Sequence, residues 1–188
     1  RQRVLIMELT QAYLKECFDY DPVTGNLIWR ARPRSHFNTV GNFYNQKSLV
    51  GKRAGADSLG YTQIKLCGTA YKAHRLIWLH VYGKWPDHEL DHINRDKSDN
   101  RLCNLRECSD SQNAHAGSAR KNKYGLRGVF RVRRKWGASI TVAGVTESLG
   151  ASFATAREAA IAYALASVDR LGAFAPIEAK QLFNEAYP

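Results

Sequence analysis

Residues 90–113 carry the sequence LDHINRDKSDNRLCNLRECSDSQN, and this stretch decides the fold. Its pattern predicts a strand over 89–93, a polar loop, and a return strand that begins near 102–105. Ser109-x-x-Gln112 is a capping box, which indicates that a helix starts at this point. Strand, loop, strand and helix together can hold one cation between the first strand and the helix.

The residues at the end of the first strand have the chemistry of a hydrolytic site. Asp91 supplies an anionic oxygen, and Mg²⁺ accepts such an oxygen together with water and phosphate oxygens. His92 can take a proton from water near neutral pH. An Asp-His pair by itself is most often a hydrogen-bonded turn. The asparagine-rich loop, Asn104-Leu105 and the capped helix are what favour catalysis here.

This segment resembles the HNH endonucleases, specifically the homing endonucleases common in phages and their introns. The resemblance implies a ββα-metal fold with one Mg²⁺ or Mn²⁺. Asp91 would be a metal ligand, and His92 would be the general base. Asn104 would brace the loop that holds His92, and Asn113 would be the second protein ligand. Other HNH enzymes have a histidine in place of Asn113, so His115, two residues further on, remains an alternative ligand.

Charge along the chain is uneven and suits a polyanionic partner. The net charge is +11, and neither 22–56 nor 111–146 contains an acidic residue. Seven of the 17 acidic residues lie between Asp87 and Asp110. Lysine and arginine near phosphates release condensed counterions, so the surplus suits a polyanion. The HNH resemblance implies that this partner is double-stranded DNA. An acidic island between two basic stretches is what a cation site on a phosphate-binding surface requires.

Residues 122–176 resemble the Apetala-two (AP-two) DNA-binding domain. The motifs that carry this resemblance are Tyr124-Gly-x-Arg-Gly-Val129, Lys135-Trp136-x-Ala138-x-Ile140, Leu149-Gly150-x-x-Phe153, Glu158-Ala-Ala160 and Ala162-Tyr163. The resemblance implies a three-stranded antiparallel sheet packed on one helix, with the sheet in the major groove. Phe130 and Val132 occupy positions that are often basic in that family, so base specificity does not transfer.

The DNA-binding candidates fall in both basic stretches. The C-terminal candidates are Arg127, Arg131, Arg133, Arg134, Lys135 and Trp136. Trp136 remains open between a DNA contact and a core position. The N-terminal candidates, expected to contact the DNA backbone, are Arg30, Arg32, Arg34, Lys52 and Arg53.

The N-terminal part of the chain contains no candidate catalytic residue. A hairpin and a helix are expected over 60–82, and 31–50 is expected to be an irregular surface loop. His74 is expected to make a structural hydrogen bond, with a phosphate contact as the alternative. We therefore predict an HNH nuclease domain over 1–116, with its core at about 74–116, followed by a linker and the domain at 122–176.

The cysteines and the apolar segments argue against structural zinc and against a secretory signal or membrane span. Cys103 and Cys108 lack a second pair at zinc-finger spacing, so we do not expect structural zinc. The apolar run at residues 4–7 is too short for a secretory signal or a membrane span. We expect a cytoplasmic protein with reduced thiols. No heptad repeat or apolar patch suggests a protein partner, so we expect a monomer.

The sequence thus predicts an α+β protein that hydrolyses DNA phosphodiester bonds with a divalent metal. A DNA-binding transcriptional regulator with a non-catalytic HNH scaffold is the alternative from another class. An RNA-binding protein is a third reading, because basicity does not distinguish the two polymers. The target sequence, and whether one strand or both are cut, remain open.

Overall fold

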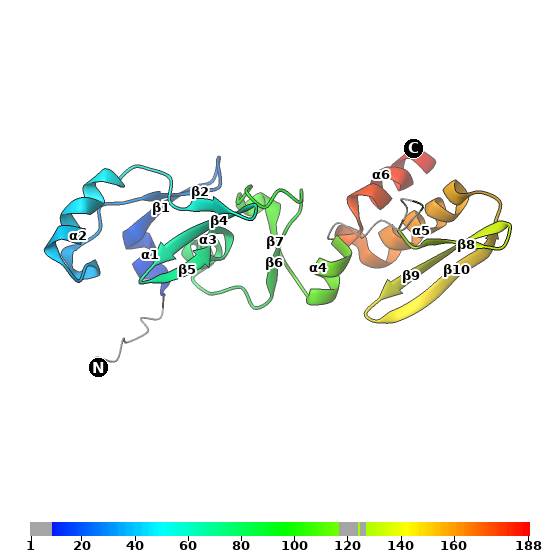
Figure 1. Cartoon of the computed structure of the whole chain (residues 1–188), viewed down its shortest axis with the longest axis horizontal. Helices are drawn as coiled ribbons and strands as arrows, with labels where there is room; N and C mark the ends of the chain where they lie inside the picture. Colours follow the sequence, from blue (N-terminus) through cyan, green and yellow to red (C-terminus); the bar gives the residue numbers. More distant parts are fainter. Residues whose placement is uncertain (1–8, 117–123, 125–126) are drawn as a thin grey trace. The chain divides into compact units, whose positions relative to one another are not determined.

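The computed structural model describes residues 9–116, 124 and 127–188, and Figure 1 shows its elements. The chain divides into two units, one ending at Glu107 and the other beginning at Cys108. Helices and small antiparallel sheets occur in both units, which confirms the predicted α+β class. The expected linker lies outside the described residues, apart from Tyr124.

The first unit begins with a short capped helix and a hairpin. In α1 (Gln11–Cys17), the Thr10 hydroxyl accepts a hydrogen bond from the Tyr13 backbone N–H at 3.2 Å. The helix runs directly into β1 (Phe18–Asp21), which pairs antiparallel with β2 (Asn26–Trp29). The turn between these strands contains Gly25, at φ +71°.

Residues 31–50 are not the irregular loop that their polarity predicts. They contain α2 (Val40–Asn45), flanked by 3-10 turns η1 (Arg34–His36) and η2 (Gln46–Ser48). Thr39 caps α2, because its hydroxyl accepts from the Asn42 backbone N–H at 3.2 Å. The buried side chain of Gln46 exchanges two hydrogen bonds with the Arg32 backbone, at 2.8 and 2.9 Å. These local bonds order a segment that has almost no hydrophobic periodicity.

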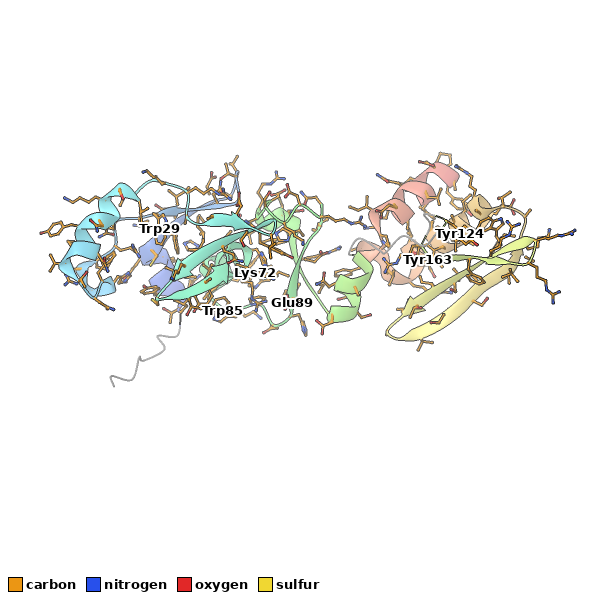
Figure 2. All side chains as sticks on the ribbon, in the orientation of Figure 1. Trp29, Lys72, Trp85, Glu89, Tyr124 and Tyr163 are labelled. Atoms are coloured by element: carbon orange, nitrogen blue, oxygen red, sulfur yellow. The ribbon has the colours of Figure 1, made fainter. Side chains whose placement is uncertain are left out.

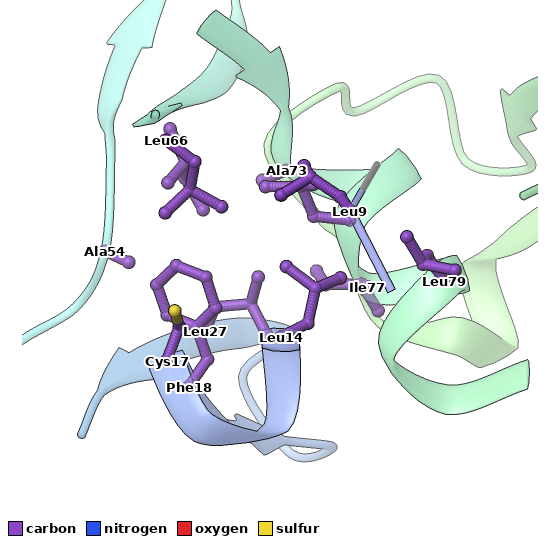
Figure 3. Packing of buried hydrophobic residues seen from close by; sticks show 12 residues of the cluster. Leu9, Leu14, Cys17, Phe18, Leu27, Ala54, Leu66, Ala73, Ile77 and Leu79 are labelled. Carbon is purple, nitrogen blue, oxygen red and sulfur yellow. The ribbon is translucent and has the colours of Figure 1, made fainter. Parts of the chain in front are cut away.

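A three-stranded antiparallel sheet and a helix complete the core of the first unit. The sheet has the order β3 (Ala56–Ser58), β4 (Tyr61–Leu66) and β5 (Thr69–Lys72), and α3 (Ala73–Tyr82) follows it. Figure 3 shows side chains of α1, β2 and α3 meeting in one apolar cluster. Its fully or almost fully buried members include Leu14, Phe18, Leu27, Ile64, Leu76 and Ile77.

The predicted strand, loop, strand and helix are present. β6 (Glu89–His92) pairs with β7 (Leu105–Cys108), and η3 (Leu102–Asn104) precedes β7. α4 (Asp110–Ala116) follows and is grouped with the second unit. Ser109 and Gln112 each bond the other's backbone N–H, at 3.2 and 2.8 Å, which confirms the capping box.

In the second unit a three-stranded antiparallel sheet packs on one helix. The strands lie in the order β10 (Val145–Phe153), β9 (Lys135–Val142) and β8 (Val129–Val132), and α5 (Ala156–Leu171) covers one face. The alanine-rich side of α5 is buried. After η4 (Gly172–Phe174), a helix that the sequence analysis did not predict, α6 (Ile177–Ala186), packs on α5.

Two further features concern membrane-spanning helices and the cysteines. Among the described residues, no helix is both long and apolar enough to cross a lipid bilayer. All four cysteines lie in the described part of the chain, and no disulfide joins any two of them.

The β1–β2 hairpin supports the loop that follows β6. The Tyr20 hydroxyl accepts a hydrogen bond from the Leu102 backbone N–H at 3.1 Å. A Cβ atom at Gly25 would lie 2.4 Å from the Arg101 backbone nitrogen and 2.6 Å from the Asn100 carbonyl carbon. Only glycine therefore allows the turn to approach this loop so closely.

We predict that Gly25→Ala destabilises the first unit and displaces the loop at Asn100. The matched control is Gly51→Ala, since Gly51 has φ +78° but no atom within 4 Å of an added Cβ. The control should cost roughly 1–2 kcal/mol of backbone strain, and Gly25→Ala roughly 1–3 kcal/mol more from overpacking. Chemical denaturation measures both, and NMR shifts of Asn100 report the displacement. Equal losses for the two variants would contradict the close approach.

Candidate active site

Asp91 and His92 are consecutive residues at the end of β6, so their side chains leave the strand on opposite faces. His92 is buried, with only 4% of its surface exposed. The Asp91 side chain is 13% exposed. The two residues therefore have separate sets of partners.

The Asp91 carboxylate forms an ion pair with Arg106 of the neighbouring strand β7. The Arg106 Nε and Nη2 atoms both donate to Asp91 Oδ2, at 2.9 and 2.6 Å. The Arg106 side chain is 17% exposed, so solvent screens this pair only in part. The other oxygen, Oδ1, accepts no hydrogen bond from the described residues. Arg106 thus holds one oxygen of Asp91 and leaves the second available to a cation.

A hydrogen bond with Asn100 orients the His92 imidazole. His92 Nε2 lies 3.1 Å from Asn100 Oδ1, and both residues are buried. Since a carboxamide oxygen only accepts, Nε2 carries the hydrogen, and Nδ1 of the neutral ring keeps its lone pair. Nδ1 has no partner among the described residues and is not fully shielded from solvent. It is therefore the nitrogen that can accept a proton.

Asn104 closes the loop between β6 and β7. Its Oδ1 accepts from the Asn94 backbone N–H at 2.9 Å. Its Nδ2 donates to Asn94 Oδ1 at 2.9 Å and to the Asp99 carbonyl at 2.8 Å. An ion pair between Arg101 and Asp99, at 2.6 Å, lowers the pKa of the Asp99 carboxyl and tightens the same loop. The loop that contains Asn100 is thus held from both ends.

His74 of α3 lies directly against His92. The two ring centroids are 5.0 Å apart and the rings are perpendicular. Tyr61 contacts both, with its centroid 5.6 Å from that of His74 and 6.1 Å from that of His92. The hydrogen bond expected for His74 is absent among the described residues, and ring packing takes its place. Burial, and then the charge of His92, lower the pKa of His74 to about 3.

Asn113 and His115 are the two expected metal ligands from the helix α4. Asn113 lies on α4 in the second unit and is partly exposed. Its backbone N–H donates to the Ser109 carbonyl at 2.8 Å, within the capped first turn. The side chain of His115 lies outside the described residues. The choice between Asn113 and His115 therefore remains open.

The Oδ1 oxygen of Asp91 is a suitable ligand for a hard cation that binds few protein side chains. Within the described part of the chain, no three His, Cys, Asp or Glu side chains gather as a metal site. A carboxylate oxygen that lacks a hydrogen-bond partner is nevertheless the kind of ligand Mg²⁺ prefers, and Mg²⁺ commonly keeps several waters. The residues present fit Mg²⁺ or Mn²⁺ bound largely by water and phosphate oxygens.

Most of the basic residues expected to bind DNA in the first unit have protein partners. Arg30 pairs with Asp19 at 3.0 Å. The Arg32 guanidinium lies 4.5 Å from the ring centroids of both Trp29 and Phe37, so it belongs to an aromatic stack. The remaining three differ: Arg34 donates to the Phe37 carbonyl, Arg53 bonds Asn26, Asp57 and Thr62, and Lys52 is exposed.

The basic residues of the second unit gather at the β8–β9 turn. Arg133, Arg134 and Lys135 are exposed there, with Arg133 at φ +51°. The Arg131 guanidinium lies 4.8 Å from the Trp136 ring centroid. Trp136 packs against the core cluster under α5, so core packing is the role that its contacts favour. Arg127 donates to the Ala114 carbonyl at 3.1 Å.

The face of the sheet opposite α5 is almost free of charge. Val129 and Ala138 are paired and buried, so their strand neighbours Phe130 and Gly137 lie on the outer face. The Phe130 ring covers Gly137, where a Cβ atom would lie 2.5 Å from Phe130 Cε2. Arg131, the one arginine of β8, therefore does not line this face.

Sequence reasoning missed several residues that surround His92. Asn100 was identified only as part of the polar loop, and Arg106 was not singled out. Tyr61, Lys72 and Lys97 were also missed. Arg106 carried a usable signal, because it lies on the strand paired with β6, where a cross-strand partner for Asp91 is expected. The other residues come from separate segments, and only the folded chain brings them together.

The buried neutral His74 predicts a pH-dependent stability. Its folded pKa of about 3 lies below the usual 6.5, so the unfolded chain alone takes up a proton as the pH falls below 6.5. Stability is therefore lost on acidification, by roughly 1 kcal/mol between pH 6.5 and 5.5. Denaturation at both pH values should show this loss for the native chain and a smaller one for His74→Asn. Equal losses would mean that His74 is protonated in the folded state.

The segment that contains these residues matches a known family. Residues 71–115 match the family model described as HNH endonuclease. The match includes α3, β6, the loop closed by Asn104, and β7. A comparison with curated proteins and one with solved structures gave no significant match. The chain thus contains an HNH endonuclease family domain at 71–115.

Proposed function

We propose that this protein is a metal-dependent endonuclease that hydrolyses phosphodiester bonds of double-stranded DNA, of the homing-endonuclease type. The observation that carries the proposal is the pairing of an oriented histidine with an available carboxylate oxygen. His92 has its Nε2 tied to Asn100, and the adjacent Asp91 keeps Oδ1 open. Both lie in the segment that matches the HNH endonuclease model.

The proposed metal is one Mg²⁺ or Mn²⁺, held by Asp91 and by Asn113 of α4. Asp91 contributes Oδ1, while the Arg106 guanidinium fixes Oδ2 and offsets part of the carboxylate charge. The role of Asn113 rests on its spacing from His92 and on the capped helix that carries it. When bound, the metal stabilises the negative charge that develops on the leaving oxygen.

His92 acts as the general base. Its Nδ1 takes a proton from the attacking water, while the Nε2–H bond to Asn100 holds the ring in the required tautomer. A charge on the imidazolium is accommodated by the Asn100 carboxamide oxygen. Asn104 contributes indirectly, because its hydrogen bonds fix the loop from which Asn100 reaches the ring. His74 adds no competing charge, since its low pKa keeps it neutral.

The second unit is proposed to hold the DNA as an AP-two-like module. A narrow three-stranded sheet fits the major groove. The exposed turn residues Arg133, Arg134 and Lys135 suit phosphate contacts at its rim, and the uncharged face around Phe130 suits contact with bases. The proposed division places the nuclease within 1–116 and the DNA-binding domain at 122–176.

We predict that His92→Ala lowers plasmid cleavage by roughly 10²–10⁴-fold, the usual contribution of a general base. Supercoiled plasmid with Mg²⁺ is the substrate, and EDTA should abolish cleavage by the native chain. Duplex DNA affinity measured in EDTA should be unchanged, because His92 is buried. His88→Ala is the matched control, since His88 is an exposed histidine just before β6. An intact plasmid with the native chain would favour a DNA-binding regulator with an HNH scaffold.

The metal ligands are tested by Mn²⁺ binding in the absence of DNA. We predict that Asp91→Ala and Asn113→Ala each weaken Mn²⁺ affinity by roughly 10-fold or more, a loss that even indirect metal partners cause. His115→Ala should leave the affinity unchanged. Titration calorimetry or the Mn²⁺ EPR signal measures the affinity. The opposite result for Asn113 and His115 would transfer the ligand role to His115.

A further inference from the structure

Two lysines from separate segments lie over one tyrosine ring beside His92. Lys72 ends β5 and is labelled in Figure 2, Lys97 comes from the loop after β6, and Tyr61 begins β4. The Lys72 and Lys97 Nζ atoms lie 4.6 and 4.7 Å from the Tyr61 ring centroid. Both distances are within the range of a cation–π interaction. The Lys97 stem also lies over the β3–β4 turn, because its Cδ is 3.7 Å from the Cβ position of Gly60.

The same ring connects both lysines with the proposed general base. The Tyr61 centroid is 6.1 Å from the His92 ring and 5.6 Å from the His74 ring. Burial is the main cause of the low pKa of His74, and the nearby charges of His92 and Lys72 lower it further. The two ammonium groups therefore border the residue that would activate water.

Neither lysine is paired with a carboxylate in the part of the first unit that the structure describes. Arg101 and Arg106, two of the arginines near the site, each hold a carboxylate at 2.6 Å. Within residues 9–116, neither Lys72 nor Lys97 forms an ion pair, and both side chains are exposed. Two like charges on one ring repel each other, and the ring quadrupole offsets this only in part. An anion beside the Tyr61 ring would be attracted by both ammonium groups, so the arrangement favours an anionic ligand.

We propose that Lys72 and Lys97, supported by Tyr61, form a phosphate-binding subsite that holds a backbone phosphate of duplex DNA beside His92. The geometry identifies an anion site, and the identity of the polyanion rests on the proposed nuclease function. A phosphate held here positions the strand next to the catalytic residues. The subsite also adds to the affinity of the first unit, whose arginines are mostly engaged with protein partners.

The subsite is tested by the salt dependence of DNA binding in EDTA, where no cleavage occurs. Each phosphate contact contributes about 0.9 to the slope of log affinity against log salt. We expect the double variant Lys72→Gln, Lys97→Gln to lower the magnitude of that slope by about 1 and to weaken binding at low salt. The control is Lys47→Gln, Lys65→Gln, with the same loss of charge. Lys47 also lies over a tyrosine, 5.7 Å from the Tyr44 ring centroid. Equal slopes for the two double variants would overturn the subsite.

A second measurement on the full chain does not depend on substitution of the lysines. Lysine acetylation with and without duplex DNA should show protection of Lys72 and Lys97 but not of Lys47. Tyr61→Phe should retain this protection because the ring remains, and Tyr61→Leu should reduce it. Equal acetylation with and without DNA would overturn the proposal.

These binding results separate the subsite from the nuclease proposal. A native chain that leaves plasmid uncut in Mg²⁺ but protects Lys72 and Lys97 keeps the subsite and loses the nuclease function. Duplex RNA that competes as well as DNA would overturn the assignment to DNA.

Discussion

The carboxamide of Asn104 closes the loop after β6, and the position of the candidate site depends on it. Its oxygen and nitrogen bond Asn94 and the Asp99 carbonyl, while its own backbone carbonyl accepts from the Ile93 N–H at 2.9 Å. An aspartate here could only accept, and an aliphatic residue could do neither. One amide thus satisfies donors and acceptors at both ends of a loop that is too polar to be held by hydrophobic packing.

Support for this loop extends through the first unit. The loop presents Asn100, whose oxygen determines which nitrogen of His92 carries the hydrogen. On its other side, the loop receives the Tyr20 hydroxyl and the turn at Gly25. The N-terminal hairpin contributes no chemistry of its own. Because its turn contacts the backbone at Asn100 and Arg101, we expect a substitution at Gly25 to act on the imidazole through the Asn100 side chain.

Much of the fold and part of the site could be predicted, because some signals are local in the sequence. The capping box at Ser109 marks the start of α4. The hairpin and helix expected over 60–82 are β4, β5 and α3. The structure differs from the expectation over 31–50, where helix capping and the hydrogen bonds of Gln46 order a segment that lacks hydrophobic periodicity. It also contains the helix α6, which was not expected. Asp91 and His92 are adjacent, so a motif reveals them. Lys72, Lys97 and Tyr61 become neighbours only through strand pairing and a loop, which spacing along the chain does not encode.

The arginines and lysines fall into two groups, those that bind other groups of the protein and those that are exposed without an ion pair. Arg30, Arg32, Arg53, Arg101 and Arg106 bind carboxylates, carboxamides or aromatic rings. Such residues stabilise the fold, and DNA could recruit them only by breaking these contacts. Counterion release is produced by cations that meet phosphate, so the net charge overstates the charge available for binding. Among the described residues, the exposed cations that lack an ion pair include Lys47, Lys52, Lys65, Lys72 and Lys97 in the first unit and Arg133, Arg134 and Lys135 in the second. DNA binding would therefore depend more on which of these charges is removed than on the total charge removed.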